Sequence, residues 1–209
     1  MLLYERCRIA GIRLGTLLLS VWLLSACTVV DLDENGKPVI PTDPSAAPSY
    51  NNMTPDKIAD ELWQPKLLPL AQQQALSWEE LKKTQSTLAD NGSKSVYVQF
   101  SGSVAKLERE TREGRLTIEV QGETVALQLG PIVKGNAIRD AAGFIRFDDF
   151  KNQVQFAQLA RAMNKKAIQN LPDVDDSWQG QNIRVLAALT LTKQGMNDAV
   201  PIELHKGAK

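Results

Sequence analysis

The sequence predicts an α+β fold: a five-stranded, OB-like antiparallel barrel with a helix between strands 3 and 4, preceded by a small helical N-terminal segment. Three observations lead to this prediction. Apolar residues recur at helical spacing up to about residue 90, and from residue 95 the period changes to two. One long amphipathic segment then separates three strand patterns from two later ones. Residues 54–209 are therefore expected to form a single domain.

The helical part spans residues 54–90, and we expect it to pack outside the barrel. Thr54 can cap the first helix. A second helix is expected to begin after Pro65. Ser77 and Glu80 have the spacing of a capping box, which predicts a third helical piece.

Five strand patterns between residues 95 and 205 make up the expected barrel. The first three form a meander with one buried face. Leu107 falls out of phase with Val104, which predicts a β-bulge near Gly102 to Lys106. The fourth pattern, NIRVLAALTLTK, is a nearly continuous apolar run. Pro201 in the fifth pattern indicates an edge strand.

The clearest helix of the chain lies between the third and fourth strands, in NQVQFAQLARAMNKKAIQNL. It is expected to start near Lys151 and to end before Pro172. Its apolar face repeats at helical spacing and comprises Phe156, Leu159, Ala160, Met163 and Ala167.

Residues 1–26 predict a lipoprotein signal peptide. Arginines precede an apolar run that is short for a membrane span of ~20 residues. The run ends in LSAC, and small residues before a cysteine are similar to a bacterial lipobox. That similarity implies cleavage before Cys27 and lipidation of its thiol; the alternative is a plain signal peptide with a chance cysteine. Residues 27–53 are rich in Pro, Asn, Asp and Ser, which predicts a flexible tether of ~30 Å.

The amino-acid composition excludes several kinds of functional site. The chain has one histidine and two cysteines, which excludes a Cys/His zinc site, a redox pair and an intrachain disulfide framework. We expect no metal and no cofactor. Cleavage removes three arginines and one glutamate, so the formal charge goes from 24 − 24 to 21 − 23, or −2. A slightly negative chain outside the cytoplasm argues against nucleic acid as a partner.

The candidate site is the stretch IRDAAGFIRFDDFKNQ. One hypothesis is a polar pocket at the barrel mouth that binds a solute hydroxyl or a partner's arginine. The other, which we favour, is a structural joint. In that joint three phenylalanines (Phe144, Phe147, Phe150) plug the barrel end, the charges pair, and Asp148 or Asp149 caps the following helix. The cluster comprises Arg139, Asp140, Arg146, Asp148, Asp149, Asn152 and Gln153.

Other features support weaker hypotheses. The acidic run DVDD, residues 173–176, suggests calcium but lacks the glycine and distal glutamate of an EF-hand loop, which favours a solvated turn. Asp140 with Asp148 or Asp149 could serve a hydrolase. However, the chain has no nucleophile-elbow or P-loop motif, and His205 has no obvious acid–base partner, so we expect no enzyme. Three tryptophans could stack on a sugar, although packing is the commoner use: Trp63, Trp78 and Trp178.

Three segments carry a resemblance to a known family: ELWQPKLLP, LQLGPIVKGNAIRDAAGFIRFDDFKNQVQFAQLARAMN and GQNIRVLAALTL. With the leader, they resemble a family of predicted periplasmic lipoproteins that has no assigned activity. Asn136 stands where that family often has threonine, which keeps a small polar group. The resemblance implies a transport context, because genes of the family are commonly found beside sugar ABC-transporter genes. It implies no catalytic residue.

We therefore expect a lipid-anchored protein on the periplasmic side of a bacterial membrane, held there through Cys27. The resemblance implies an accessory role beside a carbohydrate ABC importer, binding its solute-binding protein or a sugar-like solute. The alternative is an envelope structural or assembly lipoprotein with no small-molecule ligand. Thr28, where some inner-membrane lipoproteins have aspartate, favours the outer membrane, and the choice of membrane stays open.

Overall fold

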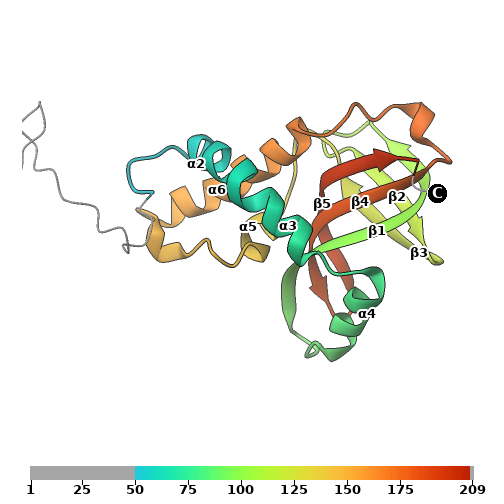
Figure 1. Ribbon diagram of the computed structural model, residues 1–209, viewed down its shortest axis with the longest axis horizontal. Coiled ribbons are helices and arrows are strands. Elements are labelled where there is room, and N and C mark those ends of the chain that lie inside the picture. The colour runs from blue at the N-terminus through green and yellow to red at the C-terminus, as the bar shows by residue number, and fades with distance from the viewer. Residues whose placement is uncertain (1–49, 208–209) are drawn as a thin grey trace, which may run out of the picture. The chain divides into compact units, whose positions relative to one another are not determined.

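The computed structural model describes residues 50–207, which fall within one compact unit, residues 47–209. The signal peptide, Cys27 and most of the expected tether lie outside the described residues. Helices come first, then three strands, a second helical part and two last strands (Figure 1). Among residues 50–207, no helix is both long enough and apolar enough to span a bilayer.

The first helical part has four elements: α2 (Pro55–Leu62), the π-helical turn η2 (Trp63–Leu67), α3 (Leu68–Gln74) and α4 (Trp78–Thr87). Thr54 caps α2, as predicted. The second α-helix, α3, begins after Pro65 as predicted; Pro65 itself lies within the π-helical turn η2, which joins α2 to α3. The capping box is confirmed: the Glu80 N–H donates to Ser77 Oγ at 3.3 Å, and the Ser77 N–H donates to Glu80 Oε2 at 2.8 Å.

Five antiparallel strands form the sheet in the order β3-β2-β1-β4-β5. Their bounds are β1 Ser93–Glu108, β2 Arg115–Val120, β3 Glu123–Gln128, β4 Asn182–Thr192 and β5 Gly195–Lys206. The edge strands β3 and β5 approach each other, so the sheet curls into a half-open barrel of the OB type. The predicted fold class is therefore confirmed, including the edge position of the strand that holds Pro201.

Strand β1 is long because its first part pairs with one strand and its last part pairs with another. It pairs with β4 over Ser93–Ser103 and with β2 over Ser103–Glu108. The register against β2 shifts between Val104 and Lys106, which confirms the predicted bulge. Gly102 lies at this crossing, where an added Cβ would be 2.4 Å from the Glu119 carbonyl oxygen.

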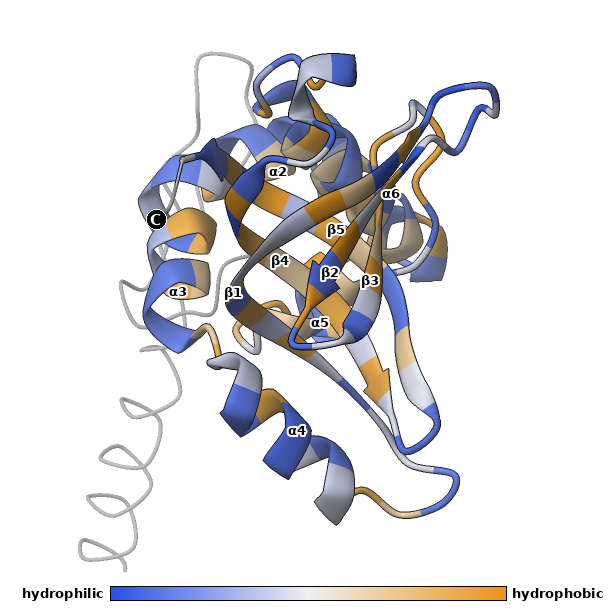
Figure 2. Ribbon diagram, turned by 90° about the vertical axis from the view of Figure 1, so that its right-hand side faces the viewer, coloured by the Kyte–Doolittle hydropathy of each residue, from blue (hydrophilic) through white to orange (hydrophobic). Residues whose placement is uncertain are grey.

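The sheet has a hydrophobic core on each face. All five strands contribute to the inner core, and α4 adds Trp78 and Leu81 to it. The outer core lies between three helices, α2, α5 (Ala137–Ala141) and α6 (Gln153–Gln169), and the outer faces of β1, β4 and β5. Strand β4 is buried on both faces, which explains its nearly continuous apolar run. The helices α2 and α3 lie outside the barrel as predicted, whereas α4 flanks the end of the sheet formed by β1 and the β4–β5 hairpin (Figure 2).

In the second helical part, α5 and α6 cover the outer face, whereas Trp178 near its end packs into the inner core. It comprises α5 (Ala137–Ala141), the short 3-10 turns η3 (Phe147–Asp149) and η4 (Asp176–Trp178), and the long helix α6 (Gln153–Gln169). Tyr97, from β1, joins the layers because its hydroxyl donates to the Ile138 carbonyl at 2.9 Å, and burial raises the pKa of this tyrosine. The predicted apolar face of α6 is buried, with Phe156 only partly covered.

The predicted cap of α6 was wrong. Asn152 is the N-cap, and its Oδ1 accepts a hydrogen bond from the Gln155 N–H at 2.9 Å. Asp148 and Asp149 lie in η3 and are separated from the helix start by an extended segment that begins at Phe150. The helix consequently begins two residues later than expected, where the first suitable side chain meets free N–H groups.

Replacing Asn152 by alanine should lower the free energy of unfolding by about 1 kcal/mol, because the first turn of α6 loses its side-chain acceptor. Urea unfolding of the full chain measures this loss. Asp148→Asn is the matched control, and it should change stability by less than ~0.5 kcal/mol. A larger loss in the aspartate variant than in the asparagine variant would contradict the observed cap.

Candidate functional site

The Arg139 and Asp140 side chains belong to α5, and the contacts of Arg139 join this helix to α6. The Arg139 side chain is 8% exposed, and its Nη2 lies 2.7 Å from Asp140 Oδ1. Its Nη1 donates to the Phe156 carbonyl at 2.9 Å. The guanidinium carbon lies 3.8 Å from the centre of the Phe156 ring. All these partners are internal, so the arginine has little left to offer a ligand.

The rest of the predicted cluster does not converge on this pair. Arg146 and Asp148 form an exposed ion pair at 3.6 Å. Asp149 is buried and lies near Tyr50. The pKa of the Tyr50 hydroxyl is raised, mainly because Tyr50 itself is partly buried and also because of the negative charges of Asp149 and Glu61. The remaining two members sit at the helix start, Asn152 as its cap and Gln153 as its exposed first residue.

The three phenylalanines do not plug the barrel. Phe150 packs on Tyr50 and Phe156 with ring centres 5.1 and 5.2 Å apart. Phe147 meets Phe156 edge to face and is half exposed. Phe144, Phe150 and Phe156 belong to the outer core, and the first turns of α6 that they cover extend beyond the sheet (Figure 1). The predicted position at the barrel mouth was therefore wrong, and a binding role for this stretch stays a prediction.

The weaker candidates serve structure. All three tryptophans are at least 94% buried, at 1%, 6% and 4% exposure for Trp63, Trp78 and Trp178. In the acidic run, Asp175 accepts from the Ser177 hydroxyl and N–H, which lowers the pKa of its carboxyl. Within residues 50–207, no group of three or more His, Cys, Asp or Glu side chains is arranged to hold a metal ion.

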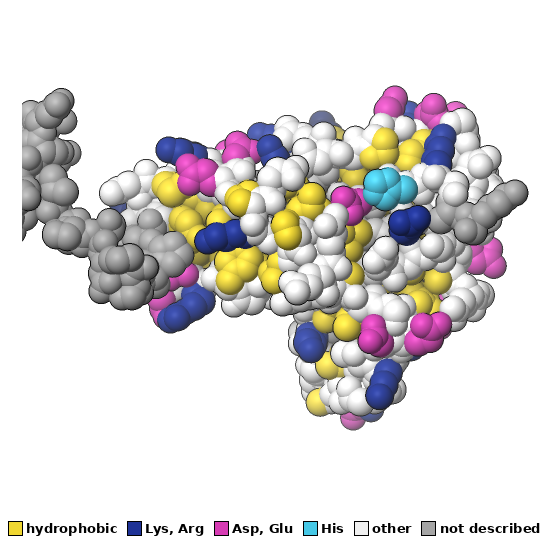
Figure 3. All heavy atoms as spheres, in the orientation of Figure 1, with side chains coloured by type: hydrophobic (Ala, Val, Ile, Leu, Met, Phe, Trp, Pro, Cys, Tyr) yellow, Lys and Arg dark blue, Asp and Glu magenta, His cyan; other side chains and the backbone are white. Residues whose placement is uncertain are grey.

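One face of the molecule shows acidic and basic side chains interspersed over the barrel, with His205 exposed among them (Figure 3). His205 lines a small cavity of about 310 Å³ with Arg184 and Glu203. Gln72 of α3 donates to both carboxylate oxygens of Glu203 at 3.1 Å, so this carboxylate is engaged by α3. The arrangement ties α3 to β5.

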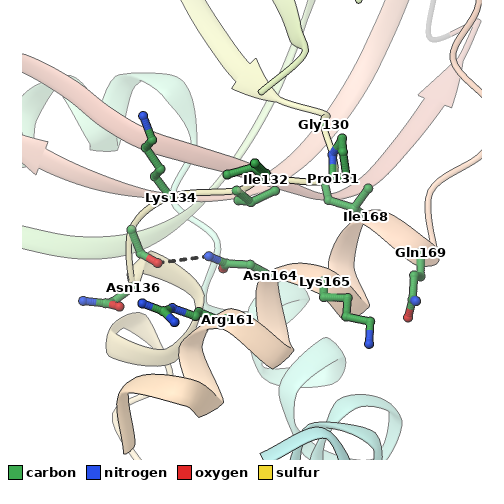
Figure 4. A pocket seen from close by; sticks show the side chains of 12 residues that line it. Gly130, Pro131, Ile132, Lys134, Asn136, Arg161, Asn164, Lys165, Ile168 and Gln169 are labelled. Atoms are coloured by element: carbon green, nitrogen blue, oxygen red, sulfur yellow. Dashed lines mark hydrogen bonds between the residues drawn. The ribbon is translucent and has the colours of Figure 1, made fainter. Parts of the chain in front are cut away.

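A larger groove lies between α6 and the connector from β3 to α5, residues 130–136 (Figure 4). Its volume is about 890 Å³, which lies within the usual range for small-molecule sites. The lining combines apolar and polar groups and contains no carboxylate: Gly130, Pro131, Ile132, Val133, Lys134, Gly135, Asn136, Arg161, Asn164, Lys165, Ile168 and Gln169.

The connector wall is held rigidly by hydrogen bonds. The Gln128 side chain makes two hydrogen bonds to the Lys134 backbone. Its Oε1 accepts from the Lys134 N–H at 2.8 Å, and its Nε2 donates to the Lys134 carbonyl at 3.1 Å. The Gly130 N–H donates to the Glu113 carbonyl at 2.7 Å. Gly135 has φ +90°, and an added Cβ there would lie 2.5 Å from Asp198 Cβ. The wall is thus formed before any ligand arrives.

Asn164 is the unusual residue of this groove. It is 1% exposed and lies in the middle of α6. Its Nδ2 donates to the Gly135 carbonyl at 3.0 Å, so its amide reaches across to the connector (Figure 4). Its Oδ1 is the one buried side-chain polar atom without a hydrogen-bond partner in the described part of the chain. A buried amide oxygen left unpaired is costly, by ~1–3 kcal/mol.

Three cationic residues line the groove: Lys134, Arg161 and Lys165. Lys165 pairs with Asp56 at 3.3 Å, and both side chains are exposed. Lys134 pairs with Glu113, and this hydrogen bond lowers the pKa of that carboxyl. Within residues 50–207, Arg161 forms no ion pair with a carboxylate. Its guanidinium lies at the end of the groove near Asn136 (Figure 4).

Comparison with protein families matches residues 17–205 to the model described as "Predicted periplasmic lipoprotein (DUF2291)". The chain belongs to this family. The resemblance of the three segments is thereby confirmed, and so is the location of this DUF2291 protein on the periplasmic side as a lipoprotein. The predicted lipidation site, Cys27, falls within the matched range but outside the described residues, and its lipidation stays a prediction.

A crystal structure of an OB-fold protein from Thermotoga maritima is similar to the DUF2291 protein, with a TM-score of 0.55 and 18% sequence identity. The similarity covers 75% of this chain and 100% of the other chain. At this identity it shows the fold alone. No curated protein matches the chain.

Proposed function

We propose that this lipoprotein is a non-enzymatic accessory module that binds a small polar solute in the groove between α6 and residues 130–136, beside a carbohydrate ABC importer. The observation that carries the proposal is Asn164, which lines a cavity of about 890 Å³ and whose buried Oδ1 has no hydrogen-bond partner. A ligand hydroxyl or N–H that donates to this oxygen would remove its desolvation penalty.

The anchored position supports an accessory role. If Cys27 is lipidated, the chain between it and the folded domain is a tether to the membrane. A tether of this length lets the domain search a shell that reaches ~30 Å from the membrane. Confinement to that shell raises the local concentration of the module near a membrane transporter and its solute-binding protein. The link to a sugar importer rests on the sequence resemblance, and the solute site rests on the groove.

The two alternative functions, a hydrolase and a structural lipoprotein, fit the observed contacts less well. A hydrolase built on Asp140 loses support, because Arg139 already engages that carboxylate at 2.7 Å. An envelope structural or assembly lipoprotein with no ligand requires no cavity and no unpaired acceptor. The groove is therefore the feature that favours solute binding over a purely structural role.

A thermal-shift screen of the full chain in detergent micelles tests the proposal. The panel contains neutral sugars, polyols, sugar acids and nucleosides. We expect a saturable rise of the melting temperature for at least one class, since a ligand at 100 times its Kd adds about 2.7 kcal/mol of stability. Asn164→Leu should abolish the rise, and Lys94→Gln, on the exposed start of β1, should preserve it. A flat response to the whole panel would reject solute binding and favour the structural alternative.

A further inference from the structure

We infer that the solute carries an oxyanion, a carboxylate or a phosphate, next to a hydroxyl or amino donor. This inference rests on the proposed function and specifies its ligand. Helix α6 presents one groove-lining stripe at helical spacing: Arg161, Asn164, Lys165, Ile168 and Gln169. Such a stripe supplies two cations and one unpaired acceptor from a single rigid element.

Arg161 is the principal anion ligand. Its guanidinium forms no ion pair with a carboxylate of the described residues, and it lies beside Asn136 at the end of the groove (Figure 4). A guanidinium presents N–H groups in a planar fork that matches the two oxygens of a carboxylate or phosphate. No acidic side chain lines the groove to neutralise it.

Two lysines at the rim can add to this field. Lys165 pairs with Asp56 across side chains that are 62% and 68% exposed, and Lys134 pairs with Glu113 across side chains that are 64% and 32% exposed. Exposed pairs of this kind contribute little, ~0–1 kcal/mol, so an incoming anion can exchange with the carboxylate at small cost. The groove therefore favours anions over neutral molecules of the same shape.

The remaining lining sets the other properties of the solute. Asn164 Oδ1 needs a donor, which a hydroxyl or amino group supplies. Ile132 is 44% exposed at the groove, and Ile168 and Pro131 also line it. These side chains suit the C–H face of a small molecule. A sugar acid or a phosphorylated polyol combines the three features.

Calorimetric titration of the full chain in detergent micelles tests the inference with matched pairs. D-Galacturonate is compared with D-galactose, and glycerophosphate with glycerol; inorganic phosphate alone tests the anion without a carbon skeleton. We expect at least one anionic member to bind about tenfold or more tighter than its neutral partner, with affinity that falls as salt rises. The first pair reports on carboxylates and the second on phosphates.

Arg161→Gln should weaken the anionic member about tenfold and leave the neutral member unchanged. Lys165→Gln should act in the same direction with a smaller effect. Arg146→Gln, in the exposed pair with Asp148, is the matched control and should change neither. Equal affinity within both pairs would overturn the inference and leave the proposed function standing. Absence of binding by every probe, together with a flat thermal screen, would overturn both.

Discussion

Replacing Arg139 by alanine should lower the free energy of unfolding by about 2–3 kcal/mol, or the melting temperature by roughly 5–10 °C. The variant loses the hydrogen bonds to Asp140 and to the Phe156 carbonyl, and it loses the cation–π contact at 3.8 Å. The loss stays below that of a fully buried pair because the Asp140 side chain is 42% exposed and can be hydrated. Thermal and urea unfolding of the full chain measure it.

Arg146→Ala is the matched control for this prediction. Its guanidinium lies 3.6 Å from Asp148, and the two side chains are 66% and 78% exposed, so the expected change is below ~0.5 kcal/mol. Solute affinity should be the same in both variants and in the parent. If Arg139→Ala kept the parent melting temperature and instead lost solute binding, the stretch from Arg139 to Gln153 would be the site and the groove would not.

Replacing Gly102 by alanine should destabilise the protein by roughly 2–4 kcal/mol. The new Cβ would lie 2.4 Å from the Glu119 carbonyl oxygen and 2.8 Å from Ile118 Cγ2. The first of these atoms is backbone in the neighbouring strand, so β2 must shift away from β1 at the point where the two strands begin to pair. Urea unfolding of the full chain measures the loss.

Gly195→Ala provides the comparison, because nothing lies within 4 Å of a Cβ added at this glycine of the β4–β5 hairpin. Its stability should remain within ~0.5 kcal/mol of the parent. Similar losses at Gly102 and Gly195 would show that the loss reflects glycine replacement in a strand rather than the close approach of two strands.

The fold was largely predictable because its signals are local. The change from helical to alternating apolar spacing located the strands, and the phase shift between Val104 and Leu107 located the bulge. One local detail was missed and another was wrong. The second helix begins after Pro65 as predicted, but the π-helical turn that joins it to α2 was not predicted. The aspartates before α6 were suitable caps by residue type, but Asn152 occupies the cap position.

The groove was harder to predict from the sequence than the fold was. Residues 130–136 have no periodicity, and their place opposite α6 depends on hydrogen bonds from Gln128 and Asn164 that only the folded chain makes. One signal was present: Asn164 follows Ala160 by four residues and therefore lies on the apolar face of α6.

The central claim is that the groove beside Asn164 binds the solute. Isotope-edited NMR of the full chain in detergent micelles tests it most directly, with D-galacturonate in one titration and glycerophosphate in another. We expect the side-chain amide of Asn164 and the backbone amides of Gly130 and residues 132–136 to shift together, while the side-chain amide of Asn152 does not move. Shifts centred on residues 139–153, with Asn164 unperturbed at saturation, would contradict it.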